Sequence, residues 1–176
     1  EADRPHLVLK YGFNHRYHES VKEAKDLIDS GKYGRVVNLR GVYGKSRMTP
    51  FSGGWRVDRS VSGGGILLDQ GIHLLDLIMY FAGSFDDVRS FVSNDFWQHD
   101  VEDNAWALLR NTATGCVAML HSTATQWRHK FRLEIALDKA LIELTGILSG
   151  SKSYGEEKLT LVEQHDGSMH GTFEEY

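Results

Sequence analysis

Two side chains that can carry proton chemistry, Asp69 and His73, stand four residues apart in an apolar segment. At helical spacing, such side chains share one face of the helix. A carboxylate beside an imidazole can orient the ring and raise its pKa by stabilising the charged form. Such a histidine can act as a general acid or base. A buried Asp–His bond that only ties the helix to a loop fits the same spacing, so both interpretations stay open.

Asp76 and Tyr80 continue this polar stripe at helical spacing. Burying such groups without partners costs about 1–3 kcal/mol each. We therefore expect water, a substrate or polar groups of another segment to face the stripe. Asp69 and His73 could supply two metal ligands, but no third His or Cys stands nearby in the sequence, so we predict no metal site.

A basic loop contains Trp55 and Arg56. Trp beside Arg can stack on a sugar ring and hold a hydroxyl, carboxylate or phosphate. Arg16, in the segment FNHRYH, could do likewise. The alternative is a solvated loop in which Trp55 only plugs a small core. The other histidines are scattered, and we expect most of them at the surface: His15, His18, His99, His129, His165 and His170.

Three consecutive glycines, at positions 63–65, directly precede the apolar segment. Glycine lets backbone approach a ligand closely, and a helix N-terminus favours anions. A flexible joint is the alternative. They do not form a dinucleotide-binding fingerprint, because no βαβ unit surrounds them.

The elements that must position these residues follow from periodicity. We predict an amphipathic helix over residues 17–30 that ends at Gly31, a long loop over residues 45–65 and a buried helix over residues 66–82. Strands are predicted over residues 7–13, 35–44, 88–96, 104–111, 117–125, 131–137, 141–144 and 159–164. Short turns join the later strands. This order indicates an α+β fold with an open, mainly antiparallel sheet and helices packed on one face.

The chain of 176 residues suits one domain, residues 1–176, with a loose tail over residues 163–176. A net charge of −4 gives no electrostatic case for nucleic acid. The single cysteine excludes an internal disulfide framework and favours a reducing compartment, so we expect a cytoplasmic protein. We find no signal-peptide pattern and no apolar run of roughly 18 residues, and we expect no membrane partner.

The strand over residues 117–125 has apolar side chains on both faces. An open sheet with helices on one side leaves its other face in need of cover. A second copy of the chain is a natural cover, so we expect a homo-oligomer.

The order of these features carries a resemblance. The most specific block reads SGGG-x-x-x-D-x-G-x-H, at residues 62–73, and a later ED-x-A strand supports it at residues 102–105. Together with YGFNHRYH and the helix ending DSGKYGRV, the chain resembles the C-terminal domain of the Gfo/Idh/MocA oxidoreductases over about residues 7–144. The resemblance implies the glyceraldehyde-3-phosphate dehydrogenase-like fold of that domain.

The resemblance also implies a reaction. Members of the family use NAD or NADP and mostly oxidise a secondary alcohol of a sugar or polyol, or run the reverse. On the matching positions, His73 would be the acid–base or its close assistant, and Asp69 would bind substrate and orient His73. Arg16, Trp55 and Arg56 match positions that often line the sugar pocket.

The chain departs from the family pattern in three places. No strand–GxGxxG–helix is present, so we expect the cofactor to be bound mainly by a dinucleotide-binding domain absent from this chain. The family's Lys–Pro motif belongs to that domain, and the turn at residues 137–140 reads LDKA where the family often has glycines. We expect the isolated chain to be inactive. The alternative is a non-catalytic, sugar-sensing module of the same fold.

Overall fold

A single open sheet organises the chain. The computed structural model describes residues 12–51, 53–147, 152–163 and 172–175. The sheet has eight strands in the order β2-β3-β4-β1-β5-β6-β7-β8. The bounds are β1 Val36–Ser46, β2 Asp87–Ser93, β3 Asn104–Arg110, β4 Val117–Gln126, β5 Lys130–Leu137, β6 Ala140–Thr145, β7 Lys158–Glu163 and β8 Thr172–Glu175.

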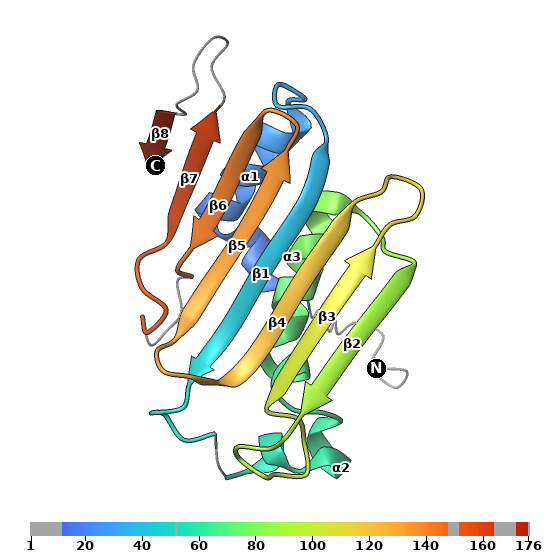
Figure 1. Ribbon diagram of the computed structural model, residues 1–176. Coiled ribbons are helices and arrows are strands. Elements are labelled where there is room, and N and C mark those ends of the chain that lie inside the picture. Colours follow the sequence, from blue (N-terminus) through green and yellow to red (C-terminus); the bar gives the residue numbers. More distant parts are fainter. Residues whose placement is uncertain (1–11, 52, 148–151, 164–171, 176) are drawn as a thin grey trace, which may run out of the picture.

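The two longer helices lie on one side of this sheet, and the short α2 lies beyond the ends of its strands (Figure 1). The two longer ones are α1 (Glu19–Asp29) and α3 (Ile72–Ala82). The short elements are two 3₁₀ turns, η1 (Asn14–Tyr17) and η2 (Trp55–Val57), the single turn α2 (Arg59–Ser62) and a π-helical turn, η3 (Leu67–Gly71). The predicted α+β architecture is therefore confirmed.

One neighbouring pair of strands, β1 with β4, is parallel, and the other pairs are antiparallel. A parallel pair needs a long crossover connection. Here the chain leaves β1, passes through α2, η3 and α3, adds β2 and β3, and returns as β4. The sheet is mainly antiparallel, as predicted, and β1 lies in its middle.

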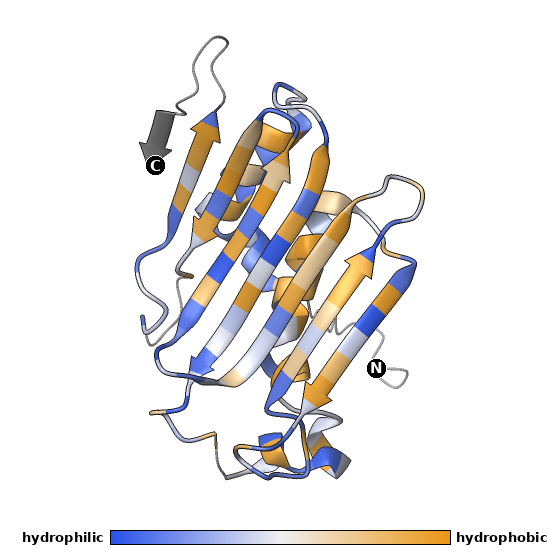
Figure 2. Cartoon of the chain, viewed as in Figure 1, coloured by the Kyte–Doolittle hydropathy of each residue, from blue (hydrophilic) through white to orange (hydrophobic). Residues whose placement is uncertain are grey.

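The core lies between α3 and the inner face of the sheet. Leu74, Leu77 and Ile78 of α3 are fully buried, as are Leu133 and Ile135 of β5. Figure 2 shows polar and apolar residues alternating along the central strands, while α3 is apolar over most of its length. The alternation follows from the period of two in a strand, which sends one side chain in two toward the helices.

The helical run Arg59–Ala82 also has the length and composition of a membrane span, with a mean hydropathy of 1.3 over its best window. The sequence expectation concerned an unbroken apolar run of roughly 18 residues, and this segment is interrupted by Asp69, His73 and Asp76. The evidence for a span is weak, since the core helix of a water-soluble fold passes the same test and 44% of the window is buried inside the structure.

Several predicted boundaries can be compared with the structure. The first helix, predicted over residues 17–30, spans Glu19–Asp29, and Gly31 just beyond it has the left-handed φ of +68° expected after a helix terminus. The strand predicted over residues 7–13 lies outside the described residues except for 12 and 13, which are not in a strand. The loose tail was wrong at residues 172–175, which form β8 and pair with β7. That pairing covers a sheet edge whose backbone groups would otherwise lack partners.

Candidate active site

The site begins where the chain enters the helical segment against β4. Gly65 is packed so closely that an added Cβ would lie 2.0 Å from the backbone oxygen of Glu102. A Cβ at Gly71 would lie 2.6 Å from the side chain of Ser122 on β4. Between these two glycines the backbone winds as η3, and Ser122 Oγ donates a hydrogen bond of 3.0 Å to the carbonyl of Ile66. Packing alone therefore accounts for Gly65 and Gly71.

Asp69 lies within the π turn η3, and its carboxylate points toward Arg56 of the basic loop. Asp69 accepts a hydrogen bond of 3.1 Å from Nε of Arg56, and the described part of the chain shows none between Asp69 and His73. The predicted orienting bond from Asp69 to His73 is therefore absent from the structure.

Three of the predicted site residues come together at this point. The Arg56 guanidinium lies 4.5 Å from the centre of the Trp55 ring while it pairs with Asp69. A cavity of about 100 Å³ is lined by Trp55, Arg56, Ser62, Gly64, Leu68 and Asp69. Trp55 is 55% exposed, so it is not the core plug considered as an alternative. An exposed aromatic face beside a cation and a carboxylate can hold a polar ring compound.

His73 is held by ring contacts. Its ring stacks on His15, with centroids 4.2 Å apart and planes 11° apart. The edge of Phe13 meets it at 5.9 Å. Within the described residues, Nδ1 of His73 is buried without a hydrogen-bond partner.

Burial lowers the pKa of His73 below its ordinary value, and the nearby carboxylates of Asp76 and Asp69 oppose this only partly. The expectation that a neighbouring carboxylate raises this pKa was therefore wrong in its net direction. Removing the ring from water disfavours its charged form. At neutral pH His73 is thus an uncharged imidazole that can accept a proton.

The rest of the polar stripe faces Arg16. Its guanidinium donates to both carboxylate oxygens of Asp76, at 2.8 and 2.5 Å, and lies 4.9 Å from the centre of the Tyr80 ring. The hydrogen bonding of Arg16 to the Asp76 carboxylate is the largest cause of the raised pKa of Arg16. Arg16 therefore fastens η1 to α3, and it does not line the cavity at Trp55 and Arg56.

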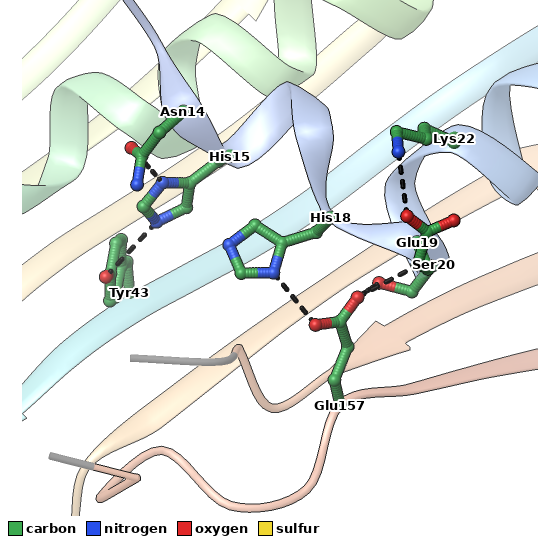
Figure 3. A network of polar contacts seen from close by, with 8 residues as sticks. All are labelled: Asn14, His15, His18, Glu19, Ser20, Lys22, Tyr43 and Glu157. Atoms are coloured by element: carbon green, nitrogen blue, oxygen red, sulfur yellow. Dashed lines mark hydrogen bonds and ion pairs between the residues drawn. The ribbon is translucent and has the colours of Figure 1, made fainter. Parts of the chain in front are cut away.

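His15 is only 7% exposed, so it is an exception to the expectation that most of the scattered histidines lie at the surface. Figure 3 shows its two ring nitrogens between Asn14 and Tyr43, with Nδ1 3.0 Å from Asn14 Oδ1 and Nε2 3.3 Å from Tyr43 Oη. Burial, with smaller effects of His73 and His18, lowers the pKa of His15 to about 3. Nothing in the local sequence signals this, because residues from β1 and α3 create the environment.

The neighbouring His18 forms a second polar contact in the same view. Its Nδ1 lies 2.8 Å from Oε2 of Glu157, whose other oxygen accepts hydrogen bonds from the backbone and hydroxyl of Ser20 (Figure 3). This ties the start of α1 to the segment before β7.

Gln70 of η3 has a second buried polar atom without a partner in the described part of the chain. Its Nε2 donates a hydrogen bond of 2.7 Å to Tyr154, while its Oε1 is buried and unpaired among the described residues. Unpaired buried polar atoms are uncommon and mark places where another group completes the hydrogen bonding. Gln70 Oε1 and His73 Nδ1 belong to residues three apart in the chain.

The residues present do not fit a dinucleotide-binding site. Gly63 ends α2 with a φ of +78°, and Gly65 is explained by its contact with Glu102, so neither is free to form a phosphate cradle. Within residues 12–51, 53–147, 152–163 and 172–175 no group of three His, Cys, Asp or Glu side chains could hold a metal ion.

The fold and the site define a class of protein, an α+β domain with an open sheet and a neutral histidine on its core helix. The model of the GFO/IDH/MocA C-terminal domain matches residues 21–143. The chain belongs to this family.

Relatives of known activity are sugar dehydrogenases and oxidoreductases. Levoglucosan dehydrogenase of Pseudarthrobacter phenanthrenivorans is 33% identical over 91 residues, which is 49% of this chain and 23% of that protein. D-Glucoside 3-dehydrogenase of Escherichia coli is 32% identical over 91 residues, which is 51% of this chain and 25% of that protein.

A solved levoglucosan dehydrogenase, in complex with NADH and levoglucosan, superposes with a TM-score of 0.77 at 23% identity, covering 94% of this chain and 46% of that one. This likeness shows the fold. The chain spans less than half the length of these relatives.

Proposed function

We propose that this chain is the substrate-binding and catalytic half of an NAD(P)-dependent oxidoreductase that acts on the CH–OH group of a sugar, sugar derivative or polyol. The observation that carries the proposal is His73, a partly buried, uncharged imidazole on which the charge of Asp69 acts, and Asp69 lines a cavity with Trp55 and Arg56. Family membership supports it, because the relatives named above oxidise sugars.

In the proposed mechanism His73 removes the proton of the substrate hydroxyl. Its Nδ1 is buried, so Nε2 is the nitrogen that accepts. Asp69 and Arg56 hold neighbouring hydroxyls, and the Trp55 ring stacks on the apolar face of the sugar. Arg16 is neutralised by Asp76, so we assign it to holding η1 in place instead of binding substrate.

A nicotinamide, when bound, takes up the hydride, because amino acid side chains do not accept one. No residue of this chain is assigned to binding the nicotinamide cofactor, because Gly63 and Gly65 have structural roles and are not free to form a phosphate cradle. We infer that a separate dinucleotide-binding domain binds it and that the isolated chain does not turn over.

Cofactor binding tests the proposal. NAD(H) and NADP(H) are titrated by calorimetry into this chain and into the full-length protein that contains it. We expect binding by the full-length protein alone, followed by turnover in a screen of sugars and polyols. If neither protein binds a cofactor, the oxidoreductase proposal fails and the sugar-sensing module is favoured. Tight binding by this chain alone would contradict the separate cofactor domain.

We also propose that the helix-free face of the sheet binds a second copy of the chain. Its β2–β4 half exposes the apolar side chains Phe91, Trp106, Leu108 and Val117. Its β1–β6 half carries the alternating ion pairs Arg40–Glu134, Arg132–Glu134 and Arg132–Glu143. Apolar side chains beside alternating charges suit a self-complementary contact between two copies.

A further inference from the structure

The ring of His73 lacks the support usual for a catalytic imidazole. A general base is normally oriented by a hydrogen bond from its second ring nitrogen to a carboxylate or carbonyl. In the described part of the chain Nδ1 of His73 has no such partner, and Asp69 is engaged by Arg56. Asp76, the other nearby carboxylate, is held at both oxygens by Arg16. The orientation of His73 must therefore come from another contact.

That contact is the face of His15. The two imidazoles lie almost parallel, 11° apart, with centroids separated by 4.2 Å. The edge of Phe13 limits His73 from a second direction at 5.9 Å. A flat ring pressed on one face cannot tilt without losing contact area, so stacking fixes the plane of His73 as a hydrogen bond would.

His15 is itself held in one orientation and one protonation state. Asn14 Oδ1 can only accept, so Nδ1 of His15 carries the proton of that 3.0 Å bond. Nε2 is then the acceptor for the Tyr43 hydroxyl at 3.3 Å, and burial raises the pKa of Tyr43 so that the hydroxyl keeps its proton. Both nitrogens are satisfied in the neutral ring (Figure 3).

We propose that His15 is a positioning residue for His73, a neutral imidazole fixed by Asn14 and Tyr43 whose face sets the plane of the His73 ring. Because His15 stays uncharged, His73 can take up the substrate proton without a second positive charge stacked upon it. The role of His15 in turnover rests on the proposed function, while its stacking on His73 and the effect of that stacking on the His73 pKa do not.

The groups that can influence the titration of His73 come from four elements. They are His15, His18 and Arg16 on or beside η1, Asp69 on η3, Asp76 on α3 and Tyr43 on β1. Arg16 and Asp76 neutralise one another. The remaining effect that a substitution at His15 can change is chiefly the burial of His73.

Two variants of His15 separate the stacked face from mere bulk, and the full-length protein is labelled in its histidines for a titration by NMR. His15→Ala removes the face and admits water. We expect the pKa of His73 to rise toward its ordinary value, and kcat to fall about 10- to 100-fold while KM changes less than about threefold. His15→Phe keeps a flat ring and the burial, so the pKa of His73 should stay low and kcat should remain well above that of His15→Ala.

Equal pKa values of His73 in the parent and in His15→Ala would overturn the proposal, as would equal kcat in the Ala and Phe variants. If no sugar is turned over at all, the proposed function fails, and the titration still decides the role of His15. If His15→Ala does not fold, Tyr43→Phe keeps the core ring and removes the hydroxyl donor. The titration of His15 should then move to higher pH. An unchanged titration would contradict the proposal that the Tyr43 hydroxyl helps to hold His15 in its neutral form.

Discussion

Asp69 accepts its hydrogen bond from Arg56, at 3.1 Å, although His73 stands four residues further along the same helical segment. Asp69 lies within the π turn η3, and its carboxylate pairs with the basic loop, while His73 lies in α3. The consequence is a division of labour in the proposed site. Asp69 belongs to the cavity with Trp55, while His73 belongs to a stack of rings with His15.

Loss of the proposed base is the most direct prediction for activity. With a substrate found for the full-length protein, His73→Ala should lower kcat about 10²- to 10⁴-fold, the usual contribution of a general acid–base. The measurement is the initial rate of NAD(P)H formation at saturating substrate. His99→Ala is the matched control, because His99 stacks on Trp97 in a different part of the chain. Undiminished turnover in His73→Ala would remove this residue from the mechanism.

The ion pair between Arg16 and Asp76 should contribute to stability. Asp76→Asn keeps the shape but loses the charge-assisted bidentate bond, and Arg16 is partly exposed, so solvent screens part of the interaction. We expect the free energy of unfolding to fall by about 1–2 kcal/mol, measured by urea denaturation. Asp29→Asn, which breaks an exposed helical pair with Lys25, should cost less than about 0.5 kcal/mol. Equal losses of unfolding free energy in the two variants would show that burial of Asp76 does not strengthen its ion pair.

The elements follow from sequence more readily than the site does. The apolar density of residues 66–82 predicts a buried helix, and alternation of apolar and polar residues predicts strands close to β1 and β3–β7. Both predictions need only the pattern of apolar residues within one segment. The partner of β1 is not predictable in this way, since its parallel pairing with β4 joins residues far apart in the chain.

Within the site, residue types indicate which side chains can take part, but their pKa values and contacts depend on the packing of distant segments. Trp55 and Arg56 were predicted as sugar-binding residues of the loop and Asp69 as the partner of His73, and in the structure these three line one cavity. The pKa of His73 was predicted in the wrong direction because burial, which depends on distant segments, outweighs the carboxylates. His15 was missed for the same reason, since Tyr43 and the helix beneath it make its surroundings.

The tight contact at Gly65 gives a prediction that separates packing from phosphate binding. In Gly65→Ala the new Cβ would lie 2.0 Å from the Glu102 carbonyl, where backbone must move and the 3.1 Å bond from Ile66 N–H to that oxygen is strained. We expect a loss of about 1–3 kcal/mol in unfolding free energy. Gly12→Ala is the control, because nothing lies within 4 Å of its added Cβ. A stable Gly65→Ala variant would reopen the ligand-binding interpretation.

The depressed pKa of His15 predicts a pH dependence of stability. The folded-state pKa is about 3, below the ordinary 6.5. Between these two pH values His15 is protonated in the unfolded chain but not in the folded chain. Stability is then fully present above about pH 6.5 and falls as the pH drops toward 3. His73, His121 and His129 have lowered pKa values in the same direction, so the informative quantity is a difference between variants.

That difference is the urea-unfolding free energy of the parent minus that of His15→Phe, measured from pH 7 to pH 4.5. We expect the parent to lose more stability across this window, because only the parent carries the His15 titration. Parallel curves would show that His15 titrates near its ordinary pKa in the folded chain.

The helix-free face of the sheet yields the last prediction. Trp106 lies on β3, is 40% exposed and stacks on His121 with ring centroids 4.5 Å apart. In Trp106→Lys a charge would stand in the middle of the apolar half of this face, and burying it without a partner is costly. Sedimentation velocity of the full-length protein should therefore show assembly weakened or lost. Met79→Lys, at a position 44% exposed on α3 in the other layer, should sediment like the parent. If both variants keep the assembly of the parent, the contact between copies uses another surface, and the open face needs a different explanation for its exposed aromatic side chains.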